Sequence, residues 1–261
     1  MYTETDGIVI KKVRLTNGKN MLTLFTKKFG KISAASNITE NNRSKSSMAV
    51  RPFSYSRFEM YKNPGSYNII NGELLRSYYK IGEDIDKYVQ AAYVMEYTDK
   101  ILAEGTQANG IYDLILDYFD MIVRRKDKYS TLTIAYQLKT LKYLGIAPVL
   151  AHCANCTKRE NPAVFSVKDG GVLCVDCLNE AQKIELQKNK NGYKNDEMLI
   201  YSLNFDIINA VTYILNNPLK ALESVTLKPE IEKGLRHVLR QYVNYHLDIG
   251  KLKTESFCWI D

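Results

Sequence analysis

The hydrophobic pattern of this 261-residue chain changes its period once, near Ile81, and this change constrains the fold more than any other feature. Before Ile81, short runs rich in β-branched and aromatic residues are separated by turn signals such as Asn17-Gly18, which is typical of antiparallel strands. After Ile81, apolar residues recur three and four positions apart, as on the buried face of a helix. The pattern therefore predicts an α+β protein whose strands precede its helices.

The first 80 residues contain strand-forming runs in an order that indicates a barrel. Three runs form a meander, the polar segment 37–47 follows as a predicted loop, and two further runs are joined by a turn at Asn63-Pro64-Gly65. The runs span residues 8–14, 21–26, 32–35, 53–61 and 67–70. This is the order of a five-stranded OB-fold barrel. An SH3-like barrel would give nearly the same pattern, so the runs alone leave both folds open.

Five amphipathic segments after residue 80 predict a helical bundle, with their apolar stripes as its core. The stripes run from Ile85 to Leu102, Ile111 to Val123, Leu132 to Leu141, Phe205 to Leu215 and Ile231 to Tyr242. Gly145 and Pro148 stop the third stripe, and Pro229 stands where the last helix would begin. The polar segment 188–195 is predicted to be a loop.

Two Cys-x-x-Cys pairs, Cys153/Cys156 and Cys174/Cys177, interrupt the helical part with 17 residues between them. Each pair turns two thiolates toward one point, and two pairs on a short hairpin complete a tetrahedral site that suits one Zn²⁺ per chain. A closed four-thiolate site has no open position for a reacting water, so the zinc is predicted to be structural. The alternatives are redox dithiols and metal-free buried thiols.

The net charge of +7 is distributed unevenly along the chain. Residues 1–80 contain 14 Lys or Arg and 5 Asp or Glu, a net charge of +9, and the remainder carries −2. A basic domain joined to a nearly neutral one indicates a polyanion partner, although a merely solvated basic surface would give the same count. The expected organisation is an OB-fold DNA-binding domain at 1–80, a helical domain at 81–261 and a zinc-finger insertion at 150–180.

Cations on the barrel segments are the predicted contacts to nucleic-acid phosphates, because counterion release makes such contacts favourable. The candidates are Lys11, Lys12, Arg14, Lys27, Lys28, Lys31, Arg43, Lys45 and Arg51. Bases need aromatic faces on which to stack. The aromatic residues of these segments are Phe25, Phe29, Phe53, Tyr55 and Tyr61. At least half of them are expected to be barrel core, so no individual stacking residue is assigned.

Two lysines of the helical part form a candidate partner-binding site. Lys139 and Lys142 are three residues apart on one helical face, opposite Leu138 and Leu141. A cationic rim beside an apolar groove would suit an acidic peptide that ends in an aromatic residue. A solvated helix face is the alternative interpretation.

Several patterns of other protein classes are absent from the sequence. It has no Gly-x-x-x-x-Gly-Lys-Ser/Thr loop, no Gly-x-Ser-x-Gly turn and only three histidines, so no enzymatic activity is expected. Its apolar runs fall short of the ~20 residues that span a bilayer. Residues 1–6 lack the basic and apolar regions of a secretory signal. A cytoplasmic protein with no membrane partner is expected, in which the cysteines do not form a disulfide framework.

Motifs along nearly the whole chain, in a fixed order, resemble the RecO family of bacterial DNA repair and recombination proteins. They are DGIVI at 6–10, RSKS at 43–46 with RPFS at 51–54, LKTLKYLG at 138–145, FS at 165–166 with GGVLCVDC at 170–177, and YHL at 245–247 with KLKT at 251–254. The zinc segment is the specific one, and the order of all five supports the resemblance. Thr157 and Val167 depart from residues common in the family, which affects local turns more than the metal.

This resemblance implies an OB domain, a helical domain and an inserted zinc module. It also implies binding of single- and double-stranded DNA and annealing of complementary strands. With its partner RecR, a family member displaces single-strand-binding protein (SSB) and helps load RecA, so the acidic tail of SSB becomes the expected ligand of Lys139 and Lys142. A nucleoid-associated location follows from the same role. A general RNA- or tRNA-binding OB protein with a structural zinc remains the alternative.

Overall fold

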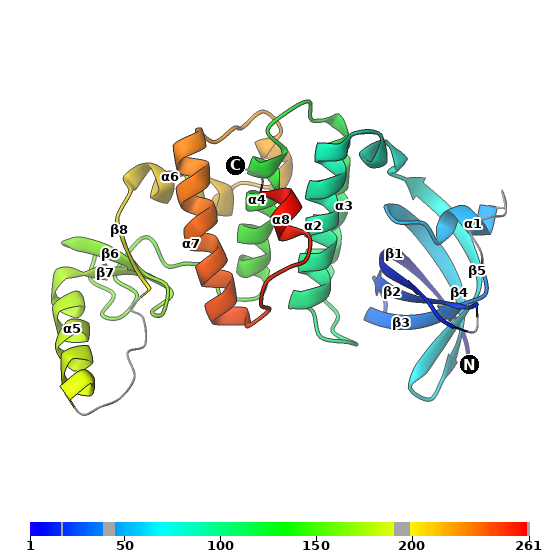
Figure 1. The fold of residues 1–261 in the computed structure, drawn as a ribbon, viewed down its shortest axis with the longest axis horizontal. Helices are drawn as coiled ribbons and strands as arrows, with labels where there is room; N and C mark the ends of the chain where they lie inside the picture. The colour runs from blue at the N-terminus through cyan, green and yellow to red at the C-terminus, as the bar shows by residue number, and fades with distance from the viewer. Residues whose placement is uncertain (17, 39–44, 191–198, 260–261) are drawn as a thin grey trace. The chain divides into compact units, whose positions relative to one another are not determined.

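The computed structural model describes residues 1–16, 18–38, 45–190 and 199–259 (Figure 1). The chain groups into two compact units, Met1–Tyr136 with Lys251–Asp261, and Gln137–Gly250. Strands precede helices in the first unit, which confirms the predicted α+β class. No helix in the described ranges has both the length and the apolarity required to cross a membrane. The domain boundaries drawn from the sequence stay a prediction.

Five strands of the described residues form a closed barrel in the order β1-β2-β3-β5-β4. They are β1 (Tyr2–Arg14), β2 (Asn20–Thr26), β3 (Gly30–Ser36), β4 (Ser54–Asn63) and β5 (Ser66–Ser77). β3 pairs with β5 in parallel, whereas β4 pairs antiparallel with both β5 and β1. The fourth strand thus lies beside the first, which is a Greek-key connection. This connection is that of an OB fold, the first of the two barrels predicted.

The barrel encloses one apolar cluster. Its members are Val9, Leu22, Leu24, Ile32, Ala34, Val50, Phe58, Met60 and Ile69. Residues of β4 alternate between buried and less buried positions, as the two-residue period of a strand requires. Phe29, Ile38 and Tyr67 are partly buried and pack against the cluster.

A short helix, α1 (Lys45–Ala49), begins inside the segment that was predicted to be a loop. The prediction is therefore wrong for residues 45–47, and residues 39–44 lie outside the described part. The helix forms because apolar residues follow the polar stretch: Ala49 is buried, and a Cβ on Gly72 of β5 would lie 2.8 Å from its Cβ. The Ser56 hydroxyl donates to the Ala49 carbonyl at 3.0 Å, which ties α1 to β4.

The helices of the first unit are packed around tyrosines. Its longer elements are the 3-10 helix η1 (Tyr79–Glu83), α2 (Ile85–Ile101), α3 (Asn109–Arg124) and α4 (Tyr129–Tyr143), of which α4 continues into the second unit. Tyr118 and Tyr136 are fully buried, and their hydroxyls pair with the hydroxyls of Thr133 at 2.9 Å and Thr98 at 2.6 Å. These bonds satisfy phenol groups that would otherwise be costly to bury.

The buried face of α2 differs from its predicted stripe. Ile85 is 72% exposed, whereas Gln90, Tyr93 and Tyr97 are buried. α2 contacts β1, α3 and the short helix α8 (Glu255–Cys258), so it is covered on more than one side. A single amphipathic stripe does not describe a helix that is packed in this way.

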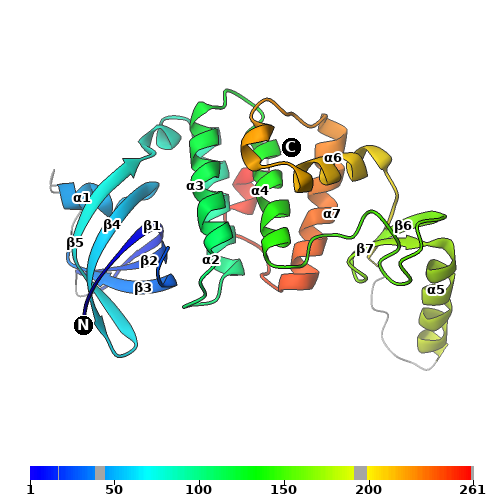
Figure 2. The same cartoon turned by 180° about the vertical axis from the view of Figure 1, so that it is seen from behind.

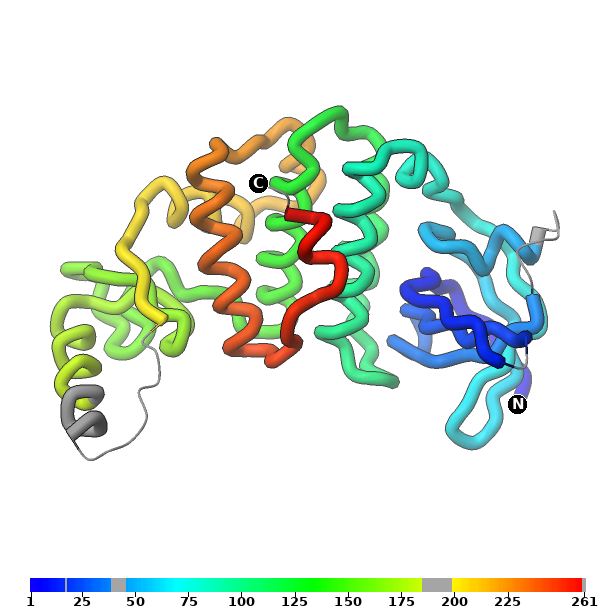
Figure 3. The backbone as a smooth tube through the Cα atoms, in the orientation of Figure 1, coloured from blue at the N-terminus to red at the C-terminus, as the bar shows by residue number. Residues whose placement is uncertain are grey.

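The C-terminal segment returns to α2 (Figure 3). The Gln90 side-chain amide donates to the carbonyl of Cys258 at 2.9 Å. The Glu96 carboxylate accepts bonds from the backbone amides of Lys253 and Thr254 and from the Thr254 hydroxyl. These contacts explain why Lys251–Asp261 belongs to the first unit although it is distant in sequence.

Barrel and helices of the first unit meet at the turn between β2 and β3. Gly30 has a φ of +67°, and a Cβ there would lie 2.0 Å from the carbonyl oxygen of Thr106. The ammonium of Lys31 forms an ion pair with the Asp99 carboxylate at 3.1 Å. Phe25 packs edge-on against Tyr112, with ring centroids 5.3 Å apart. The first residue of β3 is therefore held against the connection between α2 and α3.

The second unit contains a small sheet, in the order β7-β6-β8, and further helices (Figure 2). Its elements after α4 are β6 (Pro162–Ser166), β7 (Gly171–Cys174), α5 (Val175–Lys190), β8 (Ile200–Ser202), α6 (Phe205–Asn216), the 3-10 helix η2 (Leu219–Leu222) and α7 (Pro229–Leu247). α7 begins at Pro229 as predicted.

Helix α5 was not predicted, and it extends through Lys190. The predicted loop is therefore wrong for residues 188–190, and residues 191–195 lie outside the described part. The segment is rich in Leu, Glu, Gln and Lys, which favour helix, but it has no clear apolar stripe. Periodicity alone could not detect a helix of this composition.

We predict that Gly30→Ala lowers the free energy of unfolding by about 3 kcal/mol, because left-handed strain of about 1–2 kcal/mol adds to overpacking of similar size. Gly18→Ala is the matched control, since Gly18 has a φ of +79° but nothing within 4 Å of an added Cβ. The control should show the strain alone. Urea unfolding monitored by circular dichroism measures both, and equal losses would contradict the close approach to Thr106.

Candidate metal centre and nucleic-acid interface

Four cysteine thiols converge in the second unit. Their sulfur atoms all lie within 4.8 Å of one another, and the Sγ atoms of Cys156 and Cys174 are 3.6 Å apart. Four sulfurs that each lie about 2.3 Å from one ion would be about 3.8 Å apart. The structure thus brings together the four predicted ligands, Cys153, Cys156, Cys174 and Cys177, in a group that could hold a metal ion.

Three chain segments supply these thiols. Cys153 and Cys156 lie in the loop before β6, Cys174 ends β7, and Cys177 lies in the first turn of α5. The amide of Thr157 donates to the carbonyl of Cys153 at 2.9 Å, which closes the first knuckle. Gly171 is required by a close approach, because a Cβ there would lie 2.3 Å from the carbonyl oxygen of Val149.

The electrostatics of the cluster favour a bound cation. Burial raises the pKa of Cys153, but hydrogen bonds from the backbone of Cys156 and Cys174 outweigh it and lower the pKa to about 6. Hydrogen bonding with Cys156, followed by burial, raises the pKa of Cys177 to about 12. Several thiolates at this distance repel one another, so all four ionise together only when a positive ion compensates them.

His152 is a neighbour of the cluster and not a member of it. Its Nδ1 lies 3.1 Å from the carbonyl oxygen of Cys153. The exposed pair of Lys158 and Asp176, at 3.3 Å, joins the first knuckle to the start of α5. The donor set is therefore four sulfurs, which is the soft set that Zn²⁺ prefers in closed sites.

The predicted phosphate contacts occupy different environments on the barrel. Lys11, Arg14, Lys27, Lys28 and Arg51 are exposed, and Lys12 is half-buried. Arg43 lies outside the described residues, as does the side chain of Lys45, the first residue of α1. Lysines on the β2–β3 turn thus present their charge to solvent.

Lys31 differs from this group. Its side chain is 15% exposed and its ammonium is bonded to both the carboxylate and the carbonyl oxygen of Asp99. A cation held in this way helps to hold the barrel against α2 within the first unit.

Aromatic residues of the barrel divide in the same way. Phe25 and Phe53 are buried, Phe25 against Tyr112 and Phe53 against Phe119. Phe29 and Tyr55 are partly buried, and Tyr61 is 49% exposed. Sequence reasoning missed two residues beside Phe29: Lys62, whose ammonium lies over its ring, and Tyr67, whose ring packs on it. Their only signal in the sequence was a position on either side of the Asn63-Pro64-Gly65 turn.

The lysines predicted to bind a partner interact with the end of α6. Lys142 donates to the carbonyl of Leu215 at 2.9 Å, and Lys139 donates to the carbonyl of Asn217. Lys139 is 7% exposed, and burial, with the nearby charge of Lys142, lowers its pKa. Both ammonium groups satisfy carbonyls at the negative end of the helix dipole. Lys139 is therefore not on a solvated face.

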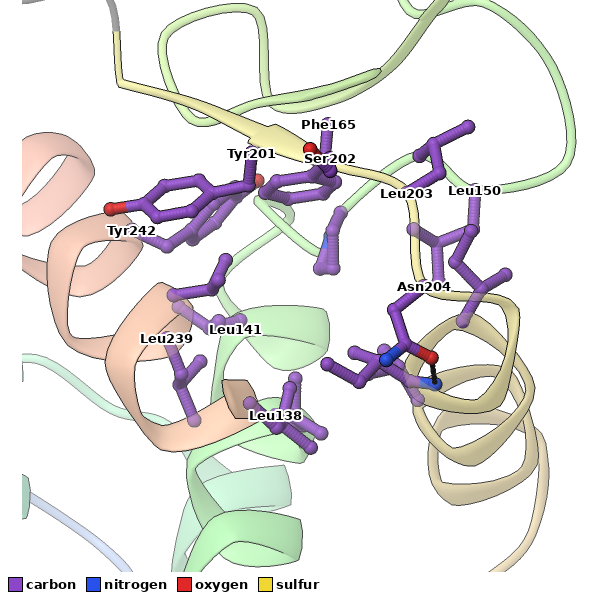
Figure 4. Close-up of a pocket in the computed structure, with 16 residues that line it drawn as sticks. Leu138, Leu141, Leu150, Phe165, Tyr201, Ser202, Leu203, Asn204, Leu239 and Tyr242 are labelled. Atoms are coloured by element: carbon purple, nitrogen blue, oxygen red, sulfur yellow. Dashed lines mark hydrogen bonds between the residues drawn. The ribbon is translucent and has the colours of Figure 1, made fainter. Parts of the chain in front are cut away.

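An apolar pocket of about 70 Å³ lies in the second unit (Figure 4). α4 contributes Leu138 and Leu141, and α7 contributes Leu239 and Tyr242. The Tyr201 ring of β8 lies along one side. The pocket offers space for an apolar or aromatic group from a ligand.

Comparisons with known proteins agree with these features. The family model described as "Recombination protein O N terminal" matches residues 1–78, and that described as "Recombination protein O C terminal" matches residues 82–186. The first covers the barrel, and the second covers the helices as far as α5 with all four cysteines. Together they match well over half of the chain.

Relatives named "DNA repair protein RecO" match along nearly the full length. One from Bacillus velezensis is 30% identical over 257 residues, which is 98% of this chain and 94% of the relative. One from Alkaliphilus metalliredigens is 28% identical over 249 residues, 95% of each chain. One from Syntrophomonas wolfei is 32% identical over 182 residues, 69% of this chain and 72% of the relative. The chain therefore belongs to the RecO family of DNA repair proteins.

Proposed function

We propose that the protein is a recombination mediator that binds single- and double-stranded DNA and anneals complementary strands. With RecR, it helps to replace SSB by RecA on single-stranded DNA. The observation that carries the proposal is the net charge of +9 on the first 80 residues of a RecO family chain, most of which form an OB barrel. Such barrels bind oligonucleotides along their strands and loops.

Annealing in this proposal needs no covalent chemistry and no nucleotide hydrolysis. Two DNA backbones repel each other, and a basic surface lowers that repulsion by replacing their counterions. Base pairing then provides the driving force. Lys27 and Lys28 are the foremost candidates for phosphate contacts, since both are exposed on the turn between β2 and β3.

The metal of the cysteine cluster is Zn²⁺ in this proposal, with a structural role. Its cluster of buried residues contains only Leu173 besides Cys153, Cys174 and Cys177, with Cys156 and Val164 packed beside it. So small an apolar core stabilises little. A closed tetrathiolate site would supply the missing binding energy to the fold.

The acidic tail of SSB is the proposed ligand of the second unit. An aromatic end of that tail would enter the apolar pocket, and its carboxylates would face the cationic side of α4. Lys142 supports this assignment, because its side chain is exposed while its ammonium reaches the end of α6. RecR and, indirectly, RecA complete the proposed partners, at work in the cytoplasm on nucleoid DNA.

Charge removal on the β2–β3 turn tests the DNA surface. We expect Lys27→Gln with Lys28→Gln to weaken single-stranded DNA binding and to make the plot of log affinity against log salt shallower by about 1.4, if each lysine contacts one phosphate. Fluorescence anisotropy from low to high salt measures both quantities. Lys100→Gln with Lys183→Gln removes equal charge from exposed positions on α2 and α5 and should change neither. Equal effects of the two pairs would place the DNA contacts off this turn.

Metal analysis tests the cluster. The purified protein should contain about one Zn²⁺ per chain, and Cys174→Ser should abolish it and lower the melting temperature, because metal binding energy is folding energy. Cys258→Ser alters a buried cysteine outside the cluster and should keep the zinc. Much less than one zinc per chain, after purification without chelator, would refute the assignment.

Strand annealing tests the mediator role. We expect faster pairing of SSB-coated complementary oligonucleotides without nucleotide, and loss of this effect when SSB lacks its acidic tail. Lys142→Glu should reduce annealing of coated strands and spare annealing of bare strands, whereas Lys183→Glu on α5 should spare both. Lys139 is unsuitable for this test because a carboxylate there would be buried.

The result that would contradict the mediator role is the absence of acceleration on both coated and bare strands. Tighter binding of RNA than of DNA in the same preparation would then favour the RNA-binding alternative.

A further inference from the structure

Four residues form a cation–aromatic cluster on the barrel, here called the Phe29 cluster: Lys28, Phe29, Lys62 and Tyr67. The ring centroids of Phe29 and Tyr67 are 5.5 Å apart, with their planes tilted by 44°. The ammonium of Lys28 lies 5.2 Å from the Phe29 centroid. The ammonium of Lys62 lies 5.7 Å from the Phe29 centroid and 5.6 Å from that of Tyr67.

Strand pairing assembles this cluster from two separate parts of the sequence. Phe29 lies in the turn between β2 and β3, and Lys62 lies directly opposite Tyr67 in the β4–β5 ladder. The parallel pairing of β3 with β5, which sets Ala34 opposite Tyr67, brings the two parts together. The hairpin that joins β4 and β5 projects past the neighbouring strands (Figures 1 and 2).

Each ring of the cluster has one side on the barrel and the other toward a cation. Phe29 and Tyr67 pack against the apolar cluster of the barrel, yet both remain partly exposed. Lys28 and Lys62 are exposed. Cation–aromatic contacts are weak at solvent-exposed sites, so these ammonium groups can leave the rings at little cost. The cluster therefore offers two aromatic faces that a stronger ligand could take over.

We propose that the Phe29 cluster is a stacking site for unpaired nucleobases, a proposal that rests on the DNA-binding function proposed above. A nucleotide carries a flat base and a phosphate anion, and the cluster carries the complement of each. When a base covers Phe29 or Tyr67, Lys28 and Lys62 move from the rings to the adjacent phosphates. Every group thus exchanges one favourable partner for another, and no charge is left uncompensated.

The geometry selects unpaired over paired strands. Bases inside a duplex are already stacked on both faces, so an aromatic side chain reaches them only after they are unstacked. Stacking also uses the face of a base and leaves its hydrogen-bonding edge accessible. A strand held on the Phe29 cluster can therefore still pair with a complementary strand, as an annealing protein requires.

Substitutions that remove the rings but keep their apolar volume test the site. Phe29→Leu and Tyr67→Leu should retain packing against the barrel and each weaken single-stranded DNA binding about tenfold, the usual scale for one lost base stack. Duplex binding should not change. The salt slope should also stay unchanged, because no cation is removed, whereas Lys62→Gln should make the slope shallower by about 0.7.

Tyr61→Leu is the matched control. Tyr61 is 49% exposed and adjoins Lys62, but it lies opposite Asn68, so it belongs to the other face of the strand. It should bind DNA like the unmodified protein. As a direct readout, photo-cross-linking with an oligonucleotide that contains 5-iododeoxyuridine should attach to Phe29 or Tyr67, as mapped by mass spectrometry.

The outcomes separate this proposal from the DNA-binding proposal on which it rests. If both leucine variants bind single strands normally while Lys27→Gln with Lys28→Gln weakens binding, the stacking site is refuted and the DNA surface stands. Equal loss of single-strand and duplex binding in the leucine variants would also refute stacking. If the unmodified protein binds neither form of DNA, the proposed function itself fails.

Discussion

Closure of the barrel through β5 is the constraint on which the proposed nucleic-acid surface depends. β5 pairs with β3 along one edge and with β4 along the other, so the backbone groups of both neighbours are satisfied only when β5 lies between them. This placement brings the start of β5 beside the β2–β3 turn. Lysines that are distant in the sequence then share one surface with Phe29 and Tyr67.

Like-charge repulsion among the thiols organises the second unit in a comparable way. A lowered pKa at Cys153 and a raised pKa at Cys177 show that the four sulfurs do not ionise alike. A bound divalent cation would remove this conflict and join three segments that have little apolar core of their own. The metal would thus hold β7 and α5 together where packing alone stabilises little.

Several lysines have structural roles that a count of charges does not show. Lys31 forms an ion pair with Asp99 inside the first unit, and Lys139 bonds a carbonyl at the end of α6 within the second. Both ammonium groups are largely removed from water, where an unpaired charge would be costly. The net charge of a segment therefore overstates the number of cations that remain available to a polyanion.

The sequence alone determined the features that depend on local pattern: the strand-to-helix order, the order of strands in the OB barrel, the start of α7 at Pro229 and the identity of the four clustered cysteines. Periodicity, turn residues and ligand spacing are local, so they can be read without coordinates. Tertiary structure decided which face of α2 is buried, that α1 and α5 form, that Lys31 and Lys139 serve the fold, and that Lys62 and Tyr67 lie beside Phe29. These depend on pairing between distant segments, and a side chain's neighbours across a closed barrel are set by strand register, which no local pattern specifies.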